Sequence, residues 1–187
     1  MNILVLGIDH EIQMMDAWRS AAMKAAYRAL LTSKLQQHGV QFIGEEAPPI
    51  CQTVGQQLSV ELALPRPWRN IDMSEQTRKD AGIYEEQMQR VPIHRPGAVQ
   101  THFHLGGFYL DLRNSSHLFC PRIPSDAVRE SYMSDRALEG AGDASSIMIL
   151  CGNFHVQGLA EIFGIHGDNV TVDAVYNYAW YDPGIDP

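Results

Sequence analysis

The sequence has few cysteines, little positive charge and no long apolar run. Its 187 residues include three cysteines, Cys51, Cys120 and Cys151, and no two of them have C-x-x-C spacing. An odd, sparse set of this kind predicts a reducing compartment and no disulfide framework. The cysteines are therefore expected to be small buried hydrophobic residues.

Membrane and nucleic-acid partners are also disfavoured. No apolar segment approaches the roughly 20 residues of a membrane helix. The N-terminus lacks the basic region and cleavage site of a signal peptide, so we expect a cytoplasmic protein. Lys and Arg number 14 against 22 Asp and Glu, a net charge of -8. That balance opposes a nucleic-acid-binding surface, which needs clustered basic residues.

Short apolar runs alternate with longer segments of helical spacing. The runs that predict strands are 2–8, 40–44, 69–73, 146–151 and 170–175. The segments that predict helices are 11–37, 50–64, 75–89, 125–138 and 156–163. Alternation of this kind predicts an α/β fold, a three-layer, mostly parallel sheet with helices on both faces. We expect a single domain over residues 1–187, a length that buries a core without disulfides.

Residues 92–124 break this pattern and predict an irregular His/Pro/Gly-rich insertion or lid. His102 and His104 alternate, as paired metal ligands on a strand do, but coincidence or an exposed strand face is the favoured explanation of the spacing. If the segment folds over a site, one of these imidazoles is a candidate proton shuttle. A lid, a dimerisation arm and a decorated loop all remain open.

Two of the predicted strands end in the same G-x-x-H motif. Gly7-Ile8-Asp9-His10 follows the first strand, and Gly152-Asn153-Phe154-His155 follows the penultimate one. Glu45 and Glu46 follow the second strand. Because ligands bind beyond the carboxyl ends of parallel strands, these side chains are expected to meet at one edge of the sheet. The glycines let the chain approach a ligand closely.

Two imidazoles and a carboxylate suit a divalent ion such as Mn, Co, Zn or Fe. Such an ion activates water as a nucleophile near neutral pH. We take His10, His155 and Glu45 as the candidate ligands, and both Glu45 and Glu46 as candidate catalytic groups. Side chains alternate along an extended chain, so one of the two glutamates should face the site and the other away. Loop histidines and surface or helix-capping glutamates are the alternative interpretation.

Arg129 is a third candidate catalytic residue. It lies near the start of a predicted helix, where the helix dipole disfavours a cation, so a role in holding an anionic group or a developing oxyanion is plausible. An ion pair with Asp126 or Glu130 is the alternative. Asp72 is expected to end the third strand at the same edge, with Arg78 nearby. No G-x-G-x-x-G follows the first strand, so the dinucleotide fingerprint is missing.

The paired motifs resemble a known superfamily. G-x-x-H near both ends of the chain, with a glutamate after the second strand, is similar to the superfamily that unites TraB/TIKI-type proteins with erythromycin-esterase and ChaN-like proteins. "RESYM", residues 129–133, resembles the R-(D/E/N)-x-x-M helix of TraB-type proteins. "HVQGLAEIF", residues 155–163, resembles their H-x-x-G-L-x-x-x-L segment. The chain is shorter than most members, and its histidine-rich stretch has no counterpart there.

The resemblance implies that His10, His155 and a glutamate line an active or ligand site. It also implies one of three activities: metal-dependent proteolysis, ester hydrolysis or haem binding. We therefore expect a small metal-dependent hydrolase acting on a small-molecule or peptide substrate. The alternatives are a non-catalytic domain that binds a small anion or haem, and an interaction domain with a relic site. The sequence leaves the substrate, the metal and the oligomeric state open, and a homo-oligomer is compatible with it.

Overall fold

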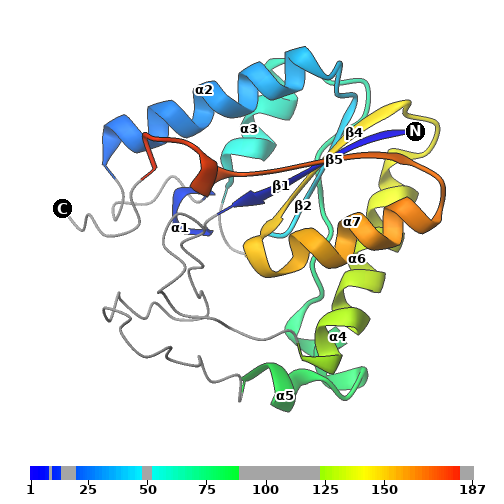
Figure 1. The fold of residues 1–187 in the computed structure, drawn as a ribbon. Coiled ribbons are helices and arrows are strands. Elements are labelled where there is room, and N and C mark those ends of the chain that lie inside the picture. The colour runs from blue at the N-terminus through cyan, green and yellow to red at the C-terminus, as the bar shows by residue number, and fades with distance from the viewer. Residues whose placement is uncertain (9, 14–19, 48–51, 89–122, 182–187) are drawn as a thin grey trace.

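The computed structural model describes residues 1–8, 10–13, 20–47, 52–88 and 123–181 (Figure 1). Within these residues the strands form one parallel sheet with the order β3-β2-β4-β1-β5. The strands are β1 (Asn2–Ile8), β2 (Phe42–Glu45), β3 (Arg69–Asn70), β4 (Ser146–Gly152) and β5 (Asn169–Ala174). The predicted α/β fold with a parallel sheet is confirmed.

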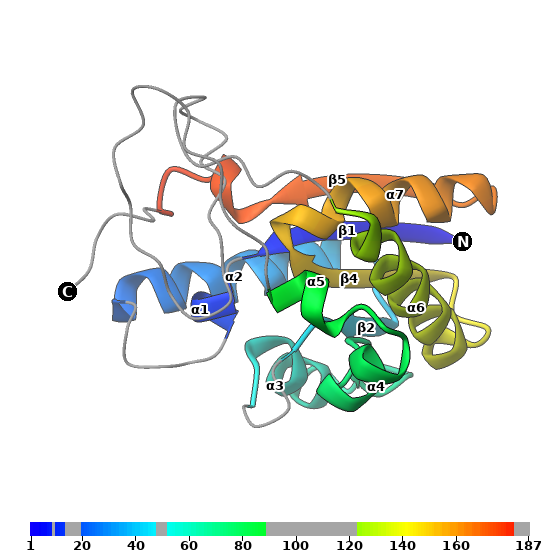
Figure 2. The ribbon, with the colours of Figure 1, turned by 90° about the horizontal axis from the view of Figure 1, so that it is seen from below.

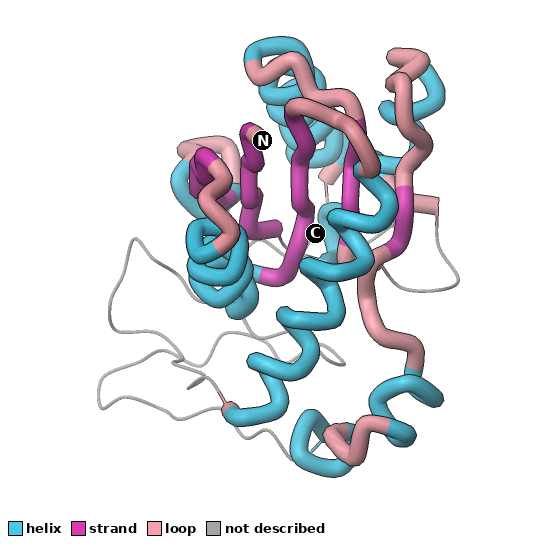
Figure 3. The backbone as a smooth tube through the Cα atoms, turned by 90° about the vertical axis from the view of Figure 1, so that its right-hand side faces the viewer, coloured by secondary structure: helices cyan, strands magenta, loops and turns pink. Residues whose placement is uncertain are grey.

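Helices cover both faces of this sheet. The larger ones are α2 (Ala21–Gln37), α3 (Val54–Glu61), α6 (Pro124–Ala141) and α7 (Val156–Ile165). The apolar side chains of α2 and α3 pack with Leu4 and Leu6 of β1, whereas those of α6 and α7 pack with Ile3 and Val5. Figures 1 and 3 show the sheet between these two helical layers. Because both faces are buried, the central strands read as continuous apolar runs.

The helix expected over residues 11–37 is two helices in the described residues. The first, α1 (His10–Gln13), directly follows the residue after β1. The second, α2, begins after Ser20, whose hydroxyl accepts a hydrogen bond from the Met23 N–H at 3.2 Å. A side chain that satisfies a free N–H at a helix start fixes the boundary there. Thr53 does the same for α3, so that helix is shorter than the predicted 50–64.

The helix expected over residues 75–89 is also divided. α4 (Glu75–Asp80) ends before Gly82, whose φ of 69° is typical of a helix C-terminal turn, and α5 (Tyr84–Met88) follows. α5 lies next to α4 (Figure 2). The Glu86 carboxylate of α5 accepts the Ser125 N–H at the start of α6 at 2.9 Å. β3 is shorter than the predicted 69–73.

Helix α6 begins one residue earlier than predicted and ends later than Leu138. Ile123 precedes the helix, Pro124 occupies its first position, and the Asp126 carboxylate accepts the Ile123 N–H at 2.9 Å. Ser125 and Asp126 therefore lie inside the first turn of α6. Of the expected 92–124 insertion, residues 92–122 lie outside the described residues, so its predicted structure is not tested.

The chain leaves β1 and β4 in opposite directions. These strands are hydrogen-bonded neighbours, from Asn2 opposite Ser146 to Ile8 opposite Gly152. β1 continues into α1 and α2 on one face, and β4 continues through η1 (Asn153–His155) into α7 on the other. Ligands of open α/β sheets bind beyond such a pair of carboxyl ends. In the described part of the chain, no helix has the length and apolarity needed to cross a membrane.

Candidate functional site

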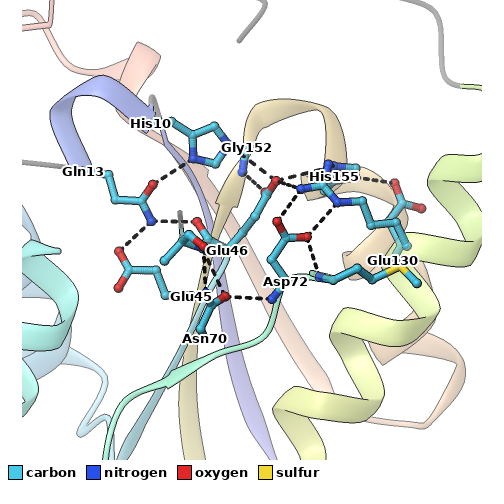
Figure 4. A network of polar contacts seen from close by, with 12 residues as sticks. His10, Gln13, Glu45, Glu46, Asn70, Asp72, Glu130, Gly152 and His155 are labelled. Carbon is cyan, nitrogen blue, oxygen red and sulfur yellow. Dashed lines mark hydrogen bonds and ion pairs between the residues drawn. The ribbon is translucent and has the colours of Figure 1, made fainter. Parts of the chain in front are cut away.

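The Glu46 carboxylate lies at the centre of a polar network beyond these strand ends (Figure 4). Its Oε1 lies 2.5 Å from Arg129 Nη2, 3.5 Å from His10 Nε2 and 3.9 Å from His155 Nε2. Its Oε2 accepts the Gly152 N–H at 2.6 Å. The sheet edge therefore brings together both motif histidines and one of the two glutamates, as the sequence predicted, and Arg129 contacts them there.

The glutamate that faces the histidines is Glu46, whereas the sequence assigned Glu45 to the metal. Glu45 is the last residue of β2, and its side chain projects to the opposite side of the chain (Figure 4). Gln13 Nε2 donates to its Oε1 at 2.8 Å, Thr53 Oγ1 donates to its Oε2 at 2.5 Å, and the Trp68 indole N–H also donates to Oε2. Successive residues alternate in direction, so only one of the pair reaches the site.

The His10 ring is oriented by Gln13. His10 Nδ1 lies 2.8 Å from Gln13 Oε1. The Gln13 amide nitrogen donates to the Glu45 carboxylate and, at 2.7 Å, to the Glu46 carbonyl oxygen, so the amide oxygen faces His10. An amide oxygen only accepts, and His10 Nδ1 therefore carries the proton in this contact. The Nε2 atom is left facing Glu46.

The His155 ring has the same tautomer for a different reason. Arg129 Nη1 lies 3.1 Å from His155 Nε2, and because a guanidinium only donates, Nε2 is the accepting nitrogen. Nδ1 therefore carries the hydrogen and donates to Glu130 Oε1 at 3.2 Å. His155 is 2% exposed and Glu130 is fully buried. The two Nε2 atoms thus face the same Glu46 oxygen.

Two glycines make room for these contacts. A Cβ on Gly152 would lie 3.0 Å from His10 Nε2, so the His10 ring approaches the end of β4 because Gly152 has no side chain. A Cβ on Gly158 would lie 2.0 Å from Glu130 Oε2, which leaves no space for the carboxylate. In the sequence, Gly158 is recognisable only as part of the H-x-x-G motif. Nothing in the sequence around Gly158 indicates that it makes room for Glu130.

Arg129 lies in the second turn of α6, not at its start. Its Nε and Nη2 donate to the two oxygens of Asp72 at 2.8 and 2.9 Å. Arg78 Nη2 donates to the same carboxylate at 2.6 Å. The observed ion pairs of Arg129 are thus with Asp72 and Glu46, rather than the alternative pairing with Asp126 or Glu130. Asp72 fixes the plane of the guanidinium beside the histidines.

The charges of the site shift the pKa values of its members. Burial by itself lowers the pKa of His10, but the Glu46 carboxylate and the Gln13 hydrogen bond outweigh it and raise the pKa to about 9. Burial raises the pKa of Glu46, yet the positive charges of Arg129 and His10 hold it well below its ordinary value. For Glu45 burial dominates and raises the pKa, although three donors act against it. Glu46 is therefore an anion and His10 a cation at neutral pH.

The donor set fits a divalent metal chemically. Metal-ligating histidines usually donate their second ring N–H to an acceptor, as both do here. Ligand atoms of one tetrahedral ion lie about 3.3 Å apart, and the distances from Glu46 Oε1 to the two Nε2 atoms are 3.5 and 3.9 Å. Arg129 occupies the space among these atoms, and the described residues contain no group of three His, Cys, Asp or Glu in metal-holding geometry.

Comparison with protein-family models, curated proteins and solved structures finds no match for this chain. The resemblance to TraB/TIKI-type and ChaN-like proteins therefore stays a prediction. Several other residues singled out in the sequence lie outside the described residues: Asp9, Cys51, Cys120, His102 and His104. Cys151 is buried in β4, where burial raises the pKa of its thiol.

Proposed function

We propose that the chain is a metal-dependent hydrolase in which His10, His155 and Glu46 bind a divalent ion, Mn, Co, Zn or Fe. One observation carries this proposal. Both imidazoles hold an Nδ1 proton against a fixed acceptor, and both direct Nε2 toward the same carboxylate oxygen. Two rings oriented by their neighbours in this way are typical of metal ligands.

Arg129 is the proposed group that steadies negative charge during hydrolysis. When bound, the metal would supply a water of lowered pKa as the nucleophile. If Glu46 and His155 bound a metal, their contacts with Arg129 Nη2 and Nη1 would be released. The guanidinium, still held by Asp72, would then offer Nη1 and the second Nη2 hydrogen to an oxyanion or an anionic substrate group. The His10 side chain is 31% exposed, so a small-molecule or peptide substrate would approach from its side.

Metal analysis by mass spectrometry tests the proposal, on protein purified without an affinity tag or chelator. Wild type and His166→Ala, an exposed histidine beyond α7, should carry near-stoichiometric metal. His10→Ala and His155→Ala should carry little and should lose hydrolysis of ester or peptide substrates. A variant that keeps wild-type metal affinity would remove its histidine from the ligand set. A wild type that stays metal-free after addition of Mn, Co and Zn would contradict the whole proposal.

A non-catalytic ligand-binding domain is the second candidate. It is favoured by the contacts of Arg129, which already satisfy Glu46 and His155 without a metal. In this alternative the exposed edge of His10, a cation at neutral pH, receives a small anion, or binds the iron of haem after losing its Nε2 proton to solvent. A Soret band on adding haem, lost in His10→Ala and accompanied by no hydrolytic turnover, would support it over the hydrolase.

A further inference from the structure

We propose that Gln13 and Glu45 form a positioning relay that fixes the Nδ1-protonated tautomer of His10, so that Nε2 is the nitrogen free to bind. The relay consists of the contacts from Glu45 through the Gln13 amide to the His10 ring. It deepens the proposed metal site and rests on that proposed function only for its effect on metal affinity. The tautomer itself is a property of the metal-free protein.

Gln13 is a buried amide whose two ends are not interchangeable. The side chain is fully buried, and its nitrogen has two acceptors, Glu45 Oε1 and the Glu46 carbonyl oxygen. If the amide were flipped, its oxygen would face Glu45 Oε1 and the Glu46 carbonyl oxygen, and both buried acceptors would lose their donor. A buried polar group without its partner costs about 1–3 kcal/mol. The oxygen is therefore held toward His10 Nδ1.

Glu45 is held as rigidly as the amide that it orients. The Trp68 indole N–H only donates, so Glu45 Oε2 must accept, and Thr53 donates to the same oxygen. Gly55 leaves room for this carboxylate, since a Cβ there would lie 2.6 Å from Oε2. The remaining oxygen, Oε1, points at Gln13. Burying a carboxylate among three neutral donors costs free energy. In the proposed relay, this buried carboxylate orients the Gln13 amide.

The two histidines are thus held by different acceptors. His155 donates directly to the Glu130 carboxylate, whereas His10 meets a neutral amide with the Glu45 carboxylate behind it. A carboxylate acceptor raises the basicity of a ligating imidazole more than an amide does. Glu45 therefore acts as a positioning residue for His10, and not as a ligand.

Nitrogen NMR of the full chain, labelled on its histidine ring nitrogens and kept metal-free, tests the relay. As the pH is raised through the titration of His10, the wild type should lose the proton on Nε2 and keep the one on Nδ1. In Glu45→Gln an amide NH₂ would oppose the Gln13 NH₂, and the Nε2-protonated tautomer of His10 should become substantial. Glu130→Gln is the matched control, which should alter the ring shifts of His155 and leave those of His10 unchanged.

Zinc titration of the same proteins gives the second readout, with an expected 10–100-fold loss of affinity in Glu45→Gln. A wild-type His10 that keeps its proton on Nε2 overturns the relay, even if the variant does not fold. So does a folded Glu45→Gln with the wild-type tautomer. A tautomer change in Glu45→Gln with no zinc binding by the wild type supports the relay while contradicting the metal site. The two proposals therefore fail separately.

Discussion

The two histidines of the site differ in exposure and in charge. The His155 side chain is 2% exposed and accepts from Arg129 on Nε2, so it is a neutral ring in this arrangement. The His10 side chain is 31% exposed and has a pKa raised to about 9. The difference comes from their neighbours, since both rings lie near the same carboxylate. At neutral pH, binding a metal at this site would have to displace the Nε2 proton of His10.

Stability of the metal-free protein should depend on His10 above neutral pH. Its pKa is about 9 in the folded chain and near 6.5 in the unfolded chain, so its contribution is fully present below pH 6.5 and is lost as the pH rises through 9. We expect a loss on the order of 2 kcal/mol over that window, after allowance for solvent screening. Urea unfolding at pH 6 and pH 10 measures it. His10→Gln should flatten the difference, and His166→Gln should not.

Gly158→Ala should disturb Glu130 and, through it, His155. The added Cβ would lie 2.0 Å from Glu130 Oε2, so the buried carboxylate must move, at an expected cost of about 1–3 kcal/mol. Gly164→Ala is a control in the same helix, because nothing lies within 4 Å of its Cβ. That change should leave stability equal or raise it by up to about 1 kcal/mol. Equal unfolding midpoints for the two variants would contradict the close fit at Gly158.

At the scale of elements, the site depends on three strands ending at the same level. The chain continues to pair beyond β2, where the Glu46 N–H donates to the Leu150 oxygen of β4 at 2.8 Å. This bond carries Glu46 alongside β4, whose end at Gly152 donates to the Glu46 carboxylate. Neighbouring strands thus position the central carboxylate with main-chain bonds, and helix α6 supplies only the groups that surround it.

A second group of charged and polar side chains connects α2 to the end of β5. Lys34 of α2 lies 2.8 Å from Asp173, which also accepts from the Tyr178 hydroxyl at 2.5 Å. Burial raises the pKa of Asp173, but these partners outweigh it and lower the pKa to about 2. This contribution is present above pH 3.8 and is lost as the pH falls through 2.

Asp173→Asn should therefore destabilise the protein by about 1 kcal/mol at pH 7, a value discounted for partial exposure. The effect should shrink toward pH 2, where the wild-type carboxylate is itself protonated. Unfolding free energies at the two pH values measure it. Asp143→Asn removes a partner of Arg66 that is 89% exposed and should change little at either pH. A constant effect of Asp173→Asn at both pH values would argue against the ionic origin.

At the scale of the whole molecule, the core and the site are largely separate. Two apolar clusters fill the spaces between the sheet and its helical layers, and neither includes His10, Glu46 or His155. Substituting a site residue therefore removes polar contacts without opening a large cavity in the core. The alanine variants of the histidines should remain folded, which makes their metal content interpretable.

Metal should stabilise the folded wild type against heat. A ligand at 100 times its Kd adds about 2.7 kcal/mol if it binds only the folded state, equivalent to roughly 5–10 °C for a chain of this length. His155→Ala should show no shift, because it removes one of the three proposed ligands. His166→Ala should shift like the wild type. A shift of wild-type size in His155→Ala would place the stabilising ion at another site.

Local pattern determined much of the fold. The apolar runs of β1 and β4 and the turn-forming glycines after them identified the two main strands and the strand-end histidines. This pattern did not divide residues 11–37 into two helices, because helical periodicity continues past Ser20. The start of α2 at that point is visible only in the hydrogen bond from the Met23 N–H to the Ser20 hydroxyl. Nor did the pattern identify β3 as a two-residue strand, since pairing with β2 decides its length.

The sequence by itself determined that two histidines and a glutamate would meet at the carboxyl edge of a parallel sheet. Strand periodicity and the direction of parallel strands are enough for that conclusion. Only the tertiary structure decided that Glu46 rather than Glu45 faces the histidines, and that Gln13 and Glu130 hold their rings. Gln13 is only three residues from His10, but the end of its amide that faces the ring is set by Glu45, 32 residues further along the chain. Hydrogen bonds across 25 or more residues leave no local pattern in a chain.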